Sequence, residues 1–344
     1  MEHKTQKIET FQQTYNILLY MEENPKKTPQ KILKERGNII KTRDDYNLIL
    51  VDSEGKVQNS EDCNWLSDES NNPLDNKAFR SRIEPWLTSL FQSEHLSLLC
   101  GSGITNAISF LARAESGTTM GGATFTNYKN EIESAAQESA KASGRENGNI
   151  EDQIRTANDL LRGLKILGET NKAQTLEQEL NSIVSEFAIS ILKSEKGIAA
   201  AVEEKRENAY RVLVNFLLSF ASRTGNKERL NIFTTNYDRL IEIGAELAGI
   251  HLMDRFVGTM MPIFRSSRLN LDIHYNPPGI RGEPRYLEGV ARLTKLHGSV
   301  DWVQNGGEIR RIGLPFGADN IDPYLQAPGL YGADALKLMI YPNS

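Results

Sequence analysis

The sequence predicts an α/β fold: a Rossmann-like parallel sheet with an inserted helical subdomain and a small N-terminal α+β appendage. Three short apolar segments, at 95–100, 230–234 and 291–296, have strand character, and each runs directly into a polar or glycine-containing turn. Between the first and second of them, residues from about 126 to 222 are almost entirely helical in period. Strands that alternate with helices in this way are typical of a parallel sheet, and the long helical stretch is expected to be an insertion.

The N-terminal appendage is assigned to residues 1–90. Apolar spacing predicts a helix at 9–23, and the turn Asp52-Ser53-Glu54-Gly55 predicts a hairpin over 45–57. Residues 58–76 are acidic and polar, which indicates a loop or linker. A helix is expected at 85–91, where the second unit begins. The fold of the appendage as a whole stays open.

The main domain is assigned to residues 91–344. A helix is expected at 106–114, a Pro/Gly-rich loop at 275–284 and a final short strand at 336–341. The helical insert, about 126–222, contains three apolar stripes: Leu160, Leu161, Leu164 and Leu167; Leu180, Ile183, Val184, Phe187, Ile189, Ile191 and Leu192; and Val212, Leu213, Phe216, Leu217 and Phe220.

Composition narrows the classes of function. The net charge of −5 gives no basic signature, which argues against direct binding of nucleic acid. The two cysteines, Cys63 and Cys100, form no Cys-x-x-Cys pair, so no four-cysteine zinc site and no other metal is expected; a disulfide is possible but not required. No signal-peptide pattern and no run of eighteen apolar residues occurs, so a cytoplasmic location without a membrane span is expected.

The first candidate motif is the segment 98–105, Leu-Leu-Cys-Gly-Ser-Gly-Ile-Thr. It combines a strand, a glycine turn and a helix start. Glycines allow the backbone to approach a pyrophosphate closely, and a helix N-terminus supplies free N–H groups. Glycine turns also end many strands that bind nothing, so this motif supports nucleotide binding only weakly by itself.

Two further motifs follow the other strands. In the segment 234–238, Thr-Thr-Asn-Tyr-Asp, the polar residues are candidates for ligand binding, but Thr235 or Asn236 could equally be a helix N-cap. In 295–302, Lys-Leu-His-Gly-Ser-Val-Asp-Trp, a histidine beside glycine is either a functional group or a structural loop residue. The other histidines are assigned to structure or surface: His3, His95, His251 and His274.

Taken in this order, the three motifs resemble those of the sirtuin superfamily: a Gly-x-Gly-Ile turn, an Asn-x-Asp segment and a His-Gly-Ser segment. The residues of the second and third motifs are most similar to those of the bacterial sirtuin-like NAD hydrolases of antiphage defence. The resemblance covers residues from about 96 to the end of the sequence. The resemblance implies hydrolysis of NAD, as substrate, to nicotinamide and ADP-ribose. It implies catalytic roles for Asn236 and His297, and NAD-binding roles for Gly101, Ser102, Gly103, Ile104, Thr105, Thr235, Asp238, Gly298 and Ser299.

By this resemblance, Asn236 orders the ribose hydroxyls or the attacking water, and His297 is the general base. Asp238 accepts a hydrogen bond from the nicotinamide carboxamide, and Thr235 and Ser299 line the ribose. Residues 101–105 take the pyrophosphate.

The chain departs from the resemblance in two ways. It has no four-cysteine zinc module, which argues against protein deacetylation. It also ends directly after the strand expected at 336–341, where family members continue into a segment that holds the adenosine, so the C-terminal part is expected to be truncated.

The sequence leaves two alternative functions open. The chain could be a non-catalytic module that senses NAD or ADP-ribose, or an ADP-ribosyltransferase. As an NAD-depleting effector it is expected to be held inactive by homo-oligomerisation or by a partner, for which a DNA-translocase ATPase or a phage-derived activator is the candidate.

Overall fold

The structure is a computed structural model. It describes residues 38–40, 49–51, 57–58, 76–114, 122–223, 227–267, 271–276, 285–326 and 330. The predicted helix at 9–23 and the predicted strand at 336–341 lie outside the described residues, as do Cys63 and most of the predicted linker and Pro/Gly-rich loop. None of the described helices has the length and apolar character required to cross a membrane.

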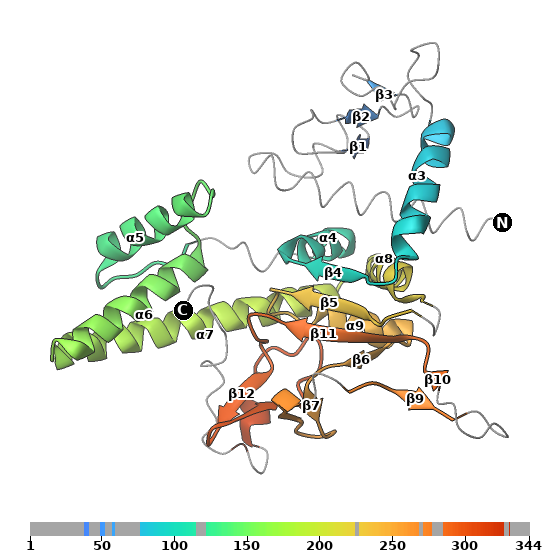
Figure 1. The fold of residues 1–344 in the computed structure, drawn as a ribbon. Coiled ribbons are helices and arrows are strands. Elements are labelled where there is room, and N and C mark those ends of the chain that lie inside the picture. The colour runs from blue at the N-terminus through green and yellow to red at the C-terminus, as the bar shows by residue number, and fades with distance from the viewer. Residues whose placement is uncertain are drawn as a thin grey trace.

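A four-stranded parallel sheet forms the centre of the fold (Figure 1), in the order β4-β5-β11-β6. The predicted Rossmann-like α/β fold is therefore confirmed. Three of the strands match the predicted segments to within two residues. The fourth, β6, was not predicted, because three partly exposed residues give no apolar pattern. The strands are β4 (Ser97–Cys100), β5 (Leu230–Thr234), β6 (His251–Met253) and β11 (Val290–Lys295).

Three helices cover one face of this sheet: α4 (Ser102–Ala112), α8 (Glu203–Ala221) and α9 (Leu240–Ala248). Alternate residues of β5 point into this core, as expected for a strand with one buried face. Helices α8 and α9 approach closely at Gly244, where an added Cβ would lie 2.7 Å from Cγ of Leu213. Glycine at this position allows the two helices to pack.

A helical arm extends to one side of the sheet (Figure 1) and consists of α5 (Lys129–Ala142), α6 (Ile150–Ile166) and the long α7 (Thr170–Ala199). Most of α7 packs in the core of the arm, whereas Ile198 near its end belongs to the core beneath the sheet.

The structure corrects the predicted insert in two respects. Helix α8 was expected to belong to the insert, but it packs on α4 and α9 against the sheet. Two stripe residues lie outside the core: Leu167 is 77% exposed because it follows the last residue of α6, and Ile189 is 39% exposed on α7. The helical period of the apolar residues identifies the helices but does not identify the neighbour against which each packs.

A second sheet is antiparallel, has the strand order β12-β13-β8-β7 and was not predicted. Its strands have two to four residues, too short for a periodic signal, and an aromatic cluster of Phe256, Phe264 and Trp302 packs on them. The remaining C-terminal elements are β7 (Phe256–Val257), β8 (Ile263–Phe264), β9 (His274–Tyr275), β10 (Arg285–Tyr286), β12 (Trp302–Asn305), β13 (Glu308–Arg311) and the 3-10 helix η4 (Asp322–Gln326).

The N-terminal elements include the predicted hairpin, formed by β2 (Ile49–Val51) and β3 (Val57–Gln58), to which β1 (Asn38–Ile40) adds a strand that was not predicted. Helix α3 (Asn76–Phe91) begins well before the expected residue 85 and contains Pro85 in its interior. Its last residue is fixed to α8 by an edge-to-face contact between Phe91 and Phe220, with ring centroids 5.0 Å apart.

Candidate functional site

The three sequence motifs meet at one edge of the central sheet. Cys100 at the end of β4 pairs with Thr234 at the end of β5, and Thr234 pairs with Lys295 at the end of β11. All three strands are parallel, so the residues that follow them emerge at the same edge. This carboxyl edge is where ligands bind in open α/β sheets.

The side chain of Asn236 joins the first two motifs. Its amide nitrogen donates to the Gly101 carbonyl at 2.9 Å and to Thr105 Oγ1 at 3.0 Å, and the residue is 8% exposed. A carbonyl oxygen only accepts, so the amide NH₂ must face Gly101, and Oδ1 is directed away from it. The structure therefore fixes the orientation of the Asn236 amide.

Asp238 links the same segment to the helices on either side. Its Oδ2 accepts a hydrogen bond from the Thr105 hydroxyl at 2.6 Å, and its Oδ1 accepts one from the Leu240 backbone N–H at 3.0 Å. The Asp238 side chain thus supplies the acceptor for a backbone N–H in the first turn of α9, where N–H groups have no partner within the helix. The alternative in which Thr235 or Asn236 caps this helix is wrong, because the Asn236 side chain bonds across to the β4 turn instead.

The glycine turn presents its backbone together with one exposed serine, Ser102. Gly101 and Ser102 are exposed, and no side chain caps the first turn of α4. The side chain of Ile104 is 4% exposed and lies in the core, so only its backbone could reach a ligand. Thr105 is also buried, and its hydroxyl holds Asp238 and Asn236. The part of this motif open to a ligand is the backbone of residues 101–103 and the exposed Ser102.

His297 follows β11 and is partly buried, with its side chain 18% exposed. Its Nδ1 is buried and has no hydrogen-bond partner. The carboxylate of Glu151 is close by, with its Oε1 3.7 Å from Nδ1. Gly298 follows with a φ of 81°, a backbone conformation that glycine adopts without strain and that turns the chain away from the strand.

Ser299 is fully buried, and its hydroxyl donates to the Tyr237 carbonyl at 3.3 Å. The Val300 backbone N–H donates to the same carbonyl at 3.0 Å. Ser299 therefore joins the second and third motifs, and the structure does not bring its side chain to the surface of the site. Thr235, by contrast, is partly exposed at the sheet edge, beside Gly101.

Sequence reasoning missed Glu151, which comes from the first turn of α6 in the helical arm. Its Oε1 accepts a hydrogen bond from the Tyr237 hydroxyl at 2.9 Å, in addition to lying near His297. The sequence Asn149-x-x-Asp152 marks the start of a helix, but no local pattern tells that this helix end reaches the sheet edge.

Buried charges fix the backbone behind the site. The Lys295 ammonium donates to the Asp238 carbonyl and to Glu242 Oε1, the latter at 2.9 Å. Arg239 forms a buried ion pair with Glu195 of α7 at 2.6 Å. Burial raises the pKa of both glutamates, although each faces a cation. These groups hold the 234–240 segment against the strand and the arm.

The Cys100 thiol is excluded as a nucleophile. Burial, and secondarily the nearby Asp238 carboxylate, raise its pKa to about 12, so at neutral pH it is a protonated, buried thiol. Cys100 is free. In the part of the chain that the structure describes, no group of three or more histidine, cysteine, aspartate or glutamate side chains could hold a metal ion.

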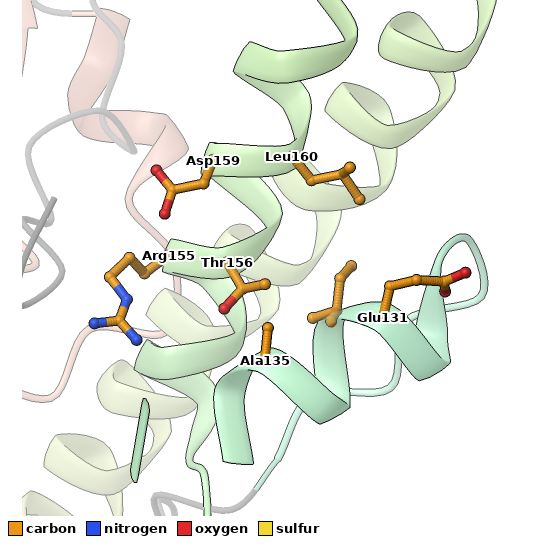
Figure 2. Close-up of a pocket in the computed structure, with 7 residues that line it drawn as sticks. Glu131, Ala135, Arg155, Thr156, Asp159 and Leu160 are labelled. Carbon is orange, nitrogen blue, oxygen red and sulfur yellow. The ribbon is translucent and has the colours of Figure 1, made fainter. Parts of the chain in front are cut away.

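A hollow lies away from the sheet edge, between α5 and α6 (Figure 2). Two of its polar side chains already have partners in the helices: Arg155 donates to Ser139 of α5 and lies 3.7 Å from Asp152 of its own helix, and the Thr156 hydroxyl donates to the Asp152 carbonyl at 2.9 Å. We therefore assign the candidate site to the sheet edge. The hollow is lined by Glu131, Ile132, Ala135, Arg155, Thr156, Asp159 and Leu160.

Comparison with protein-family models and with curated protein sequences gave no match for this chain.

Proposed function

We propose that this protein hydrolyses NAD at the bond between nicotinamide and ribose. The observation that carries the proposal is the convergence of an uncapped helix start, Asn236 and His297 at the carboxyl edge of three adjacent parallel strands. A dinucleotide needs a pyrophosphate site beside the groups that act on its ribose, and such an edge provides both.

In the proposed reaction, the bond from C1′ to the nicotinamide nitrogen breaks, and its electron pair leaves with nicotinamide. A water oxygen bonds to C1′ and loses a proton to His297. The products are nicotinamide and ADP-ribose. Because positive charge develops at the ribose, groups that are already oriented contribute most to the rate. Asn236 meets this condition, since its amide is fixed by Gly101 and Thr105.

The remaining assignments follow from the resemblance to sirtuin-like NAD hydrolases. The backbone of residues 101–103 takes the pyrophosphate, and Thr235 lines the ribose. Asp238 accepts from the nicotinamide carboxamide; both of its oxygens have protein donors, but each carboxylate oxygen has a further lone pair. Ser299 acts in this scheme by holding the His297 loop to Tyr237.

The same resemblance supports a biological role as an NAD-depleting effector of bacterial antiphage defence, acting in the cytoplasm. Uncontrolled loss of NAD is toxic to a cell. We therefore propose that oligomerisation, or a partner such as a DNA-translocase ATPase or a phage-derived activator, controls the activity.

A second candidate is a module that binds NAD or ADP-ribose without cleaving it. One observation favours it: the Asn236 amide nitrogen and both Asp238 oxygens already have partners within the protein, which is also the arrangement of a purely structural network. Transfer of ADP-ribose to a macromolecule would use the same residues. Labelled NAD separates it from hydrolysis, because transfer leaves label on protein or nucleic acid.

The test measures the release of nicotinamide from NAD by chromatography. It uses the full-length protein together with any partner encoded beside it. Asn236→Ala and His297→Ala are compared with His251→Ala, an exposed histidine on β6, as the matched control. We expect release by the wild type and the control, and a loss of at least about 100-fold in both site variants. Binding of NAD without release would support the sensor instead.

A further inference from the structure

The unpartnered nitrogen of His297 is the starting point. Nδ1 is buried and makes no hydrogen bond, although most buried polar atoms in proteins make one. Glu151 Oε1, at 3.7 Å, is beyond hydrogen-bond distance but within reach of a small rotation of the imidazole ring. Hydrogen bonds to catalytic groups are often long before substrate binds and shorten in the complex.

The position of Glu151 is fixed by its surroundings. Asn149 and Asp152 form a reciprocal capping box at the start of α6. Arg145 holds the Asp152 carboxylate with two hydrogen bonds, at 2.9 and 2.8 Å. The Tyr237 hydroxyl donates to the Oε1 atom that faces His297. The capping box therefore fixes the helix start that carries Glu151, and the Tyr237 hydroxyl holds the carboxylate itself toward the histidine.

We propose that Glu151 is a positioning residue that fixes the tautomer of His297, a role that rests on the proposed hydrolysis of NAD. It accepts the Nδ1–H of the neutral imidazole, which leaves the lone pair on Nε2 to take the proton from water. When that proton is transferred, the imidazole becomes cationic, and the Glu151 carboxylate stabilises the charge. Glu151 itself touches neither NAD nor water in this scheme and keeps its own protonation state.

The first experiment reads the tautomer directly and does not depend on activity. The full chain is labelled with ¹⁵N-histidine, and the His297 resonances are assigned by their loss in His297→Ala. In the wild type at a pH where His297 is neutral, we expect the nitrogen shifts of an Nδ1–H tautomer. Glu151→Ala should move them toward the Nε2–H tautomer, whereas Glu138→Ala, at an exposed glutamate on α5, should not. An unchanged tautomer in Glu151→Ala would overturn the proposal.

The second experiment measures kcat and KM for NAD. Glu151→Ala should lower kcat by roughly 10- to 100-fold with little change in KM, because it affects the base and not the binding of substrate. Glu151→Gln keeps an acceptor oxygen of the same reach, so it should retain the tautomer and show a smaller loss of kcat. A Glu151→Ala variant with wild-type kcat would refute the role.

The two failures are distinguishable. A wild type that never releases nicotinamide refutes the proposed function, while the tautomer measurement still tests the contact between Glu151 and His297. Thermal unfolding of each variant identifies misfolding. If Glu151→Ala unfolds, the wild-type spectrum still decides, because an Nε2–H tautomer in the wild type would overturn the proposal.

Discussion

The buried ion pair between Arg239 and Glu195 predicts a large and asymmetric response to substitution. Glu195 lies in the last third of α7, and Arg239 lies between Asp238 and the first residue of α9. The Glu195 side chain is 1% exposed, and the Arg239 side chain is 8% exposed. The guanidinium also donates to the carbonyls of Leu314 and Pro315, so the pair joins three parts of the chain.

The magnitude follows from what each substitution leaves behind. Removing one partner of a buried pair costs about 3–5 kcal/mol, because an uncompensated charge stays buried. The cost of Glu195→Leu should lie at the upper end of this range, since arginine does not lose its proton in proteins. Arg239→Met should lie at the lower end, because burial already raises the pKa of Glu195 and the carboxyl can take up a proton.

The double variant Glu195→Leu/Arg239→Met removes both charges. It leaves the carbonyls of Leu314 and Pro315 without this donor and the Arg239 backbone N–H without its acceptor, at about 1 kcal/mol each. We therefore expect it to be less stable than the wild type by about 3 kcal/mol, which is less than the sum of the two single variants. The coupling energy in the double-mutant cycle should be at least about 3 kcal/mol.

The assay is urea unfolding followed by circular dichroism, with the midpoint compared at constant slope. The matched control is the exposed pair of Lys165 and Glu177, which joins α6 and α7 at 2.8 Å with side chains 52% and 45% exposed. Glu177→Gln should cost less than about 1 kcal/mol. If Glu195→Leu costs no more than this control, the reasoning from burial is refuted.

Three further predictions concern other parts of the fold. Hydrogen bonds from Arg145 and the backbone overcome burial and lower the pKa of Asp152; its stabilising contribution is therefore present above the unfolded pKa of about 3.9 and lost as pH falls through the lower folded value. Asp152→Asn should cost about 1 kcal/mol at pH 7, and the difference from wild type in acid unfolding should vanish at low pH. In a Cys63→Ser background, iodoacetamide at pH 8 should label Cys100 only in denaturant, because its pKa is about 12; labelling of the folded protein would contradict the burial. Gly244→Ala should destabilise by about 1–3 kcal/mol in thermal unfolding, because the new Cβ would meet side chains of α8, whereas Gly163→Ala on α6, with nothing within 4 Å, should be neutral or stabilising.

Much of the central fold is predictable from local pattern. Strand β5 has a regular alternation of buried and partly exposed residues, so it was predicted at its observed bounds. The apolar stripes in the arm predicted helices there but did not give the bounds of each helix. Strand β6 has three residues and no such pattern, and it exists because β11 offers a paired edge. A strand that depends on its neighbour rather than on its own sequence is invisible to local analysis.

The site was predictable in its backbone and less so in its side chains. The topology alone brings the residues after β4, β5 and β11 to one edge, which is why the three motifs meet. Which side chains face a ligand depends on contacts made across the fold. Ser299 and Ile104 were expected to contact NAD and are buried, whereas Glu151, distant in the sequence, lies beside His297.

The helical arm is part of the site rather than an appendage to it. Three of its contacts end on two residues of the strand-end segment: Glu151 and Phe187 contact Tyr237, with the rings of Phe187 and Tyr237 5.6 Å apart, and Glu195 pairs with Arg239. Asn236 precedes these residues, and the His297 loop is bonded to the Tyr237 carbonyl through Ser299. A movement of the arm would therefore displace both proposed catalytic residues at once. A partner that binds the arm could control the site without touching it.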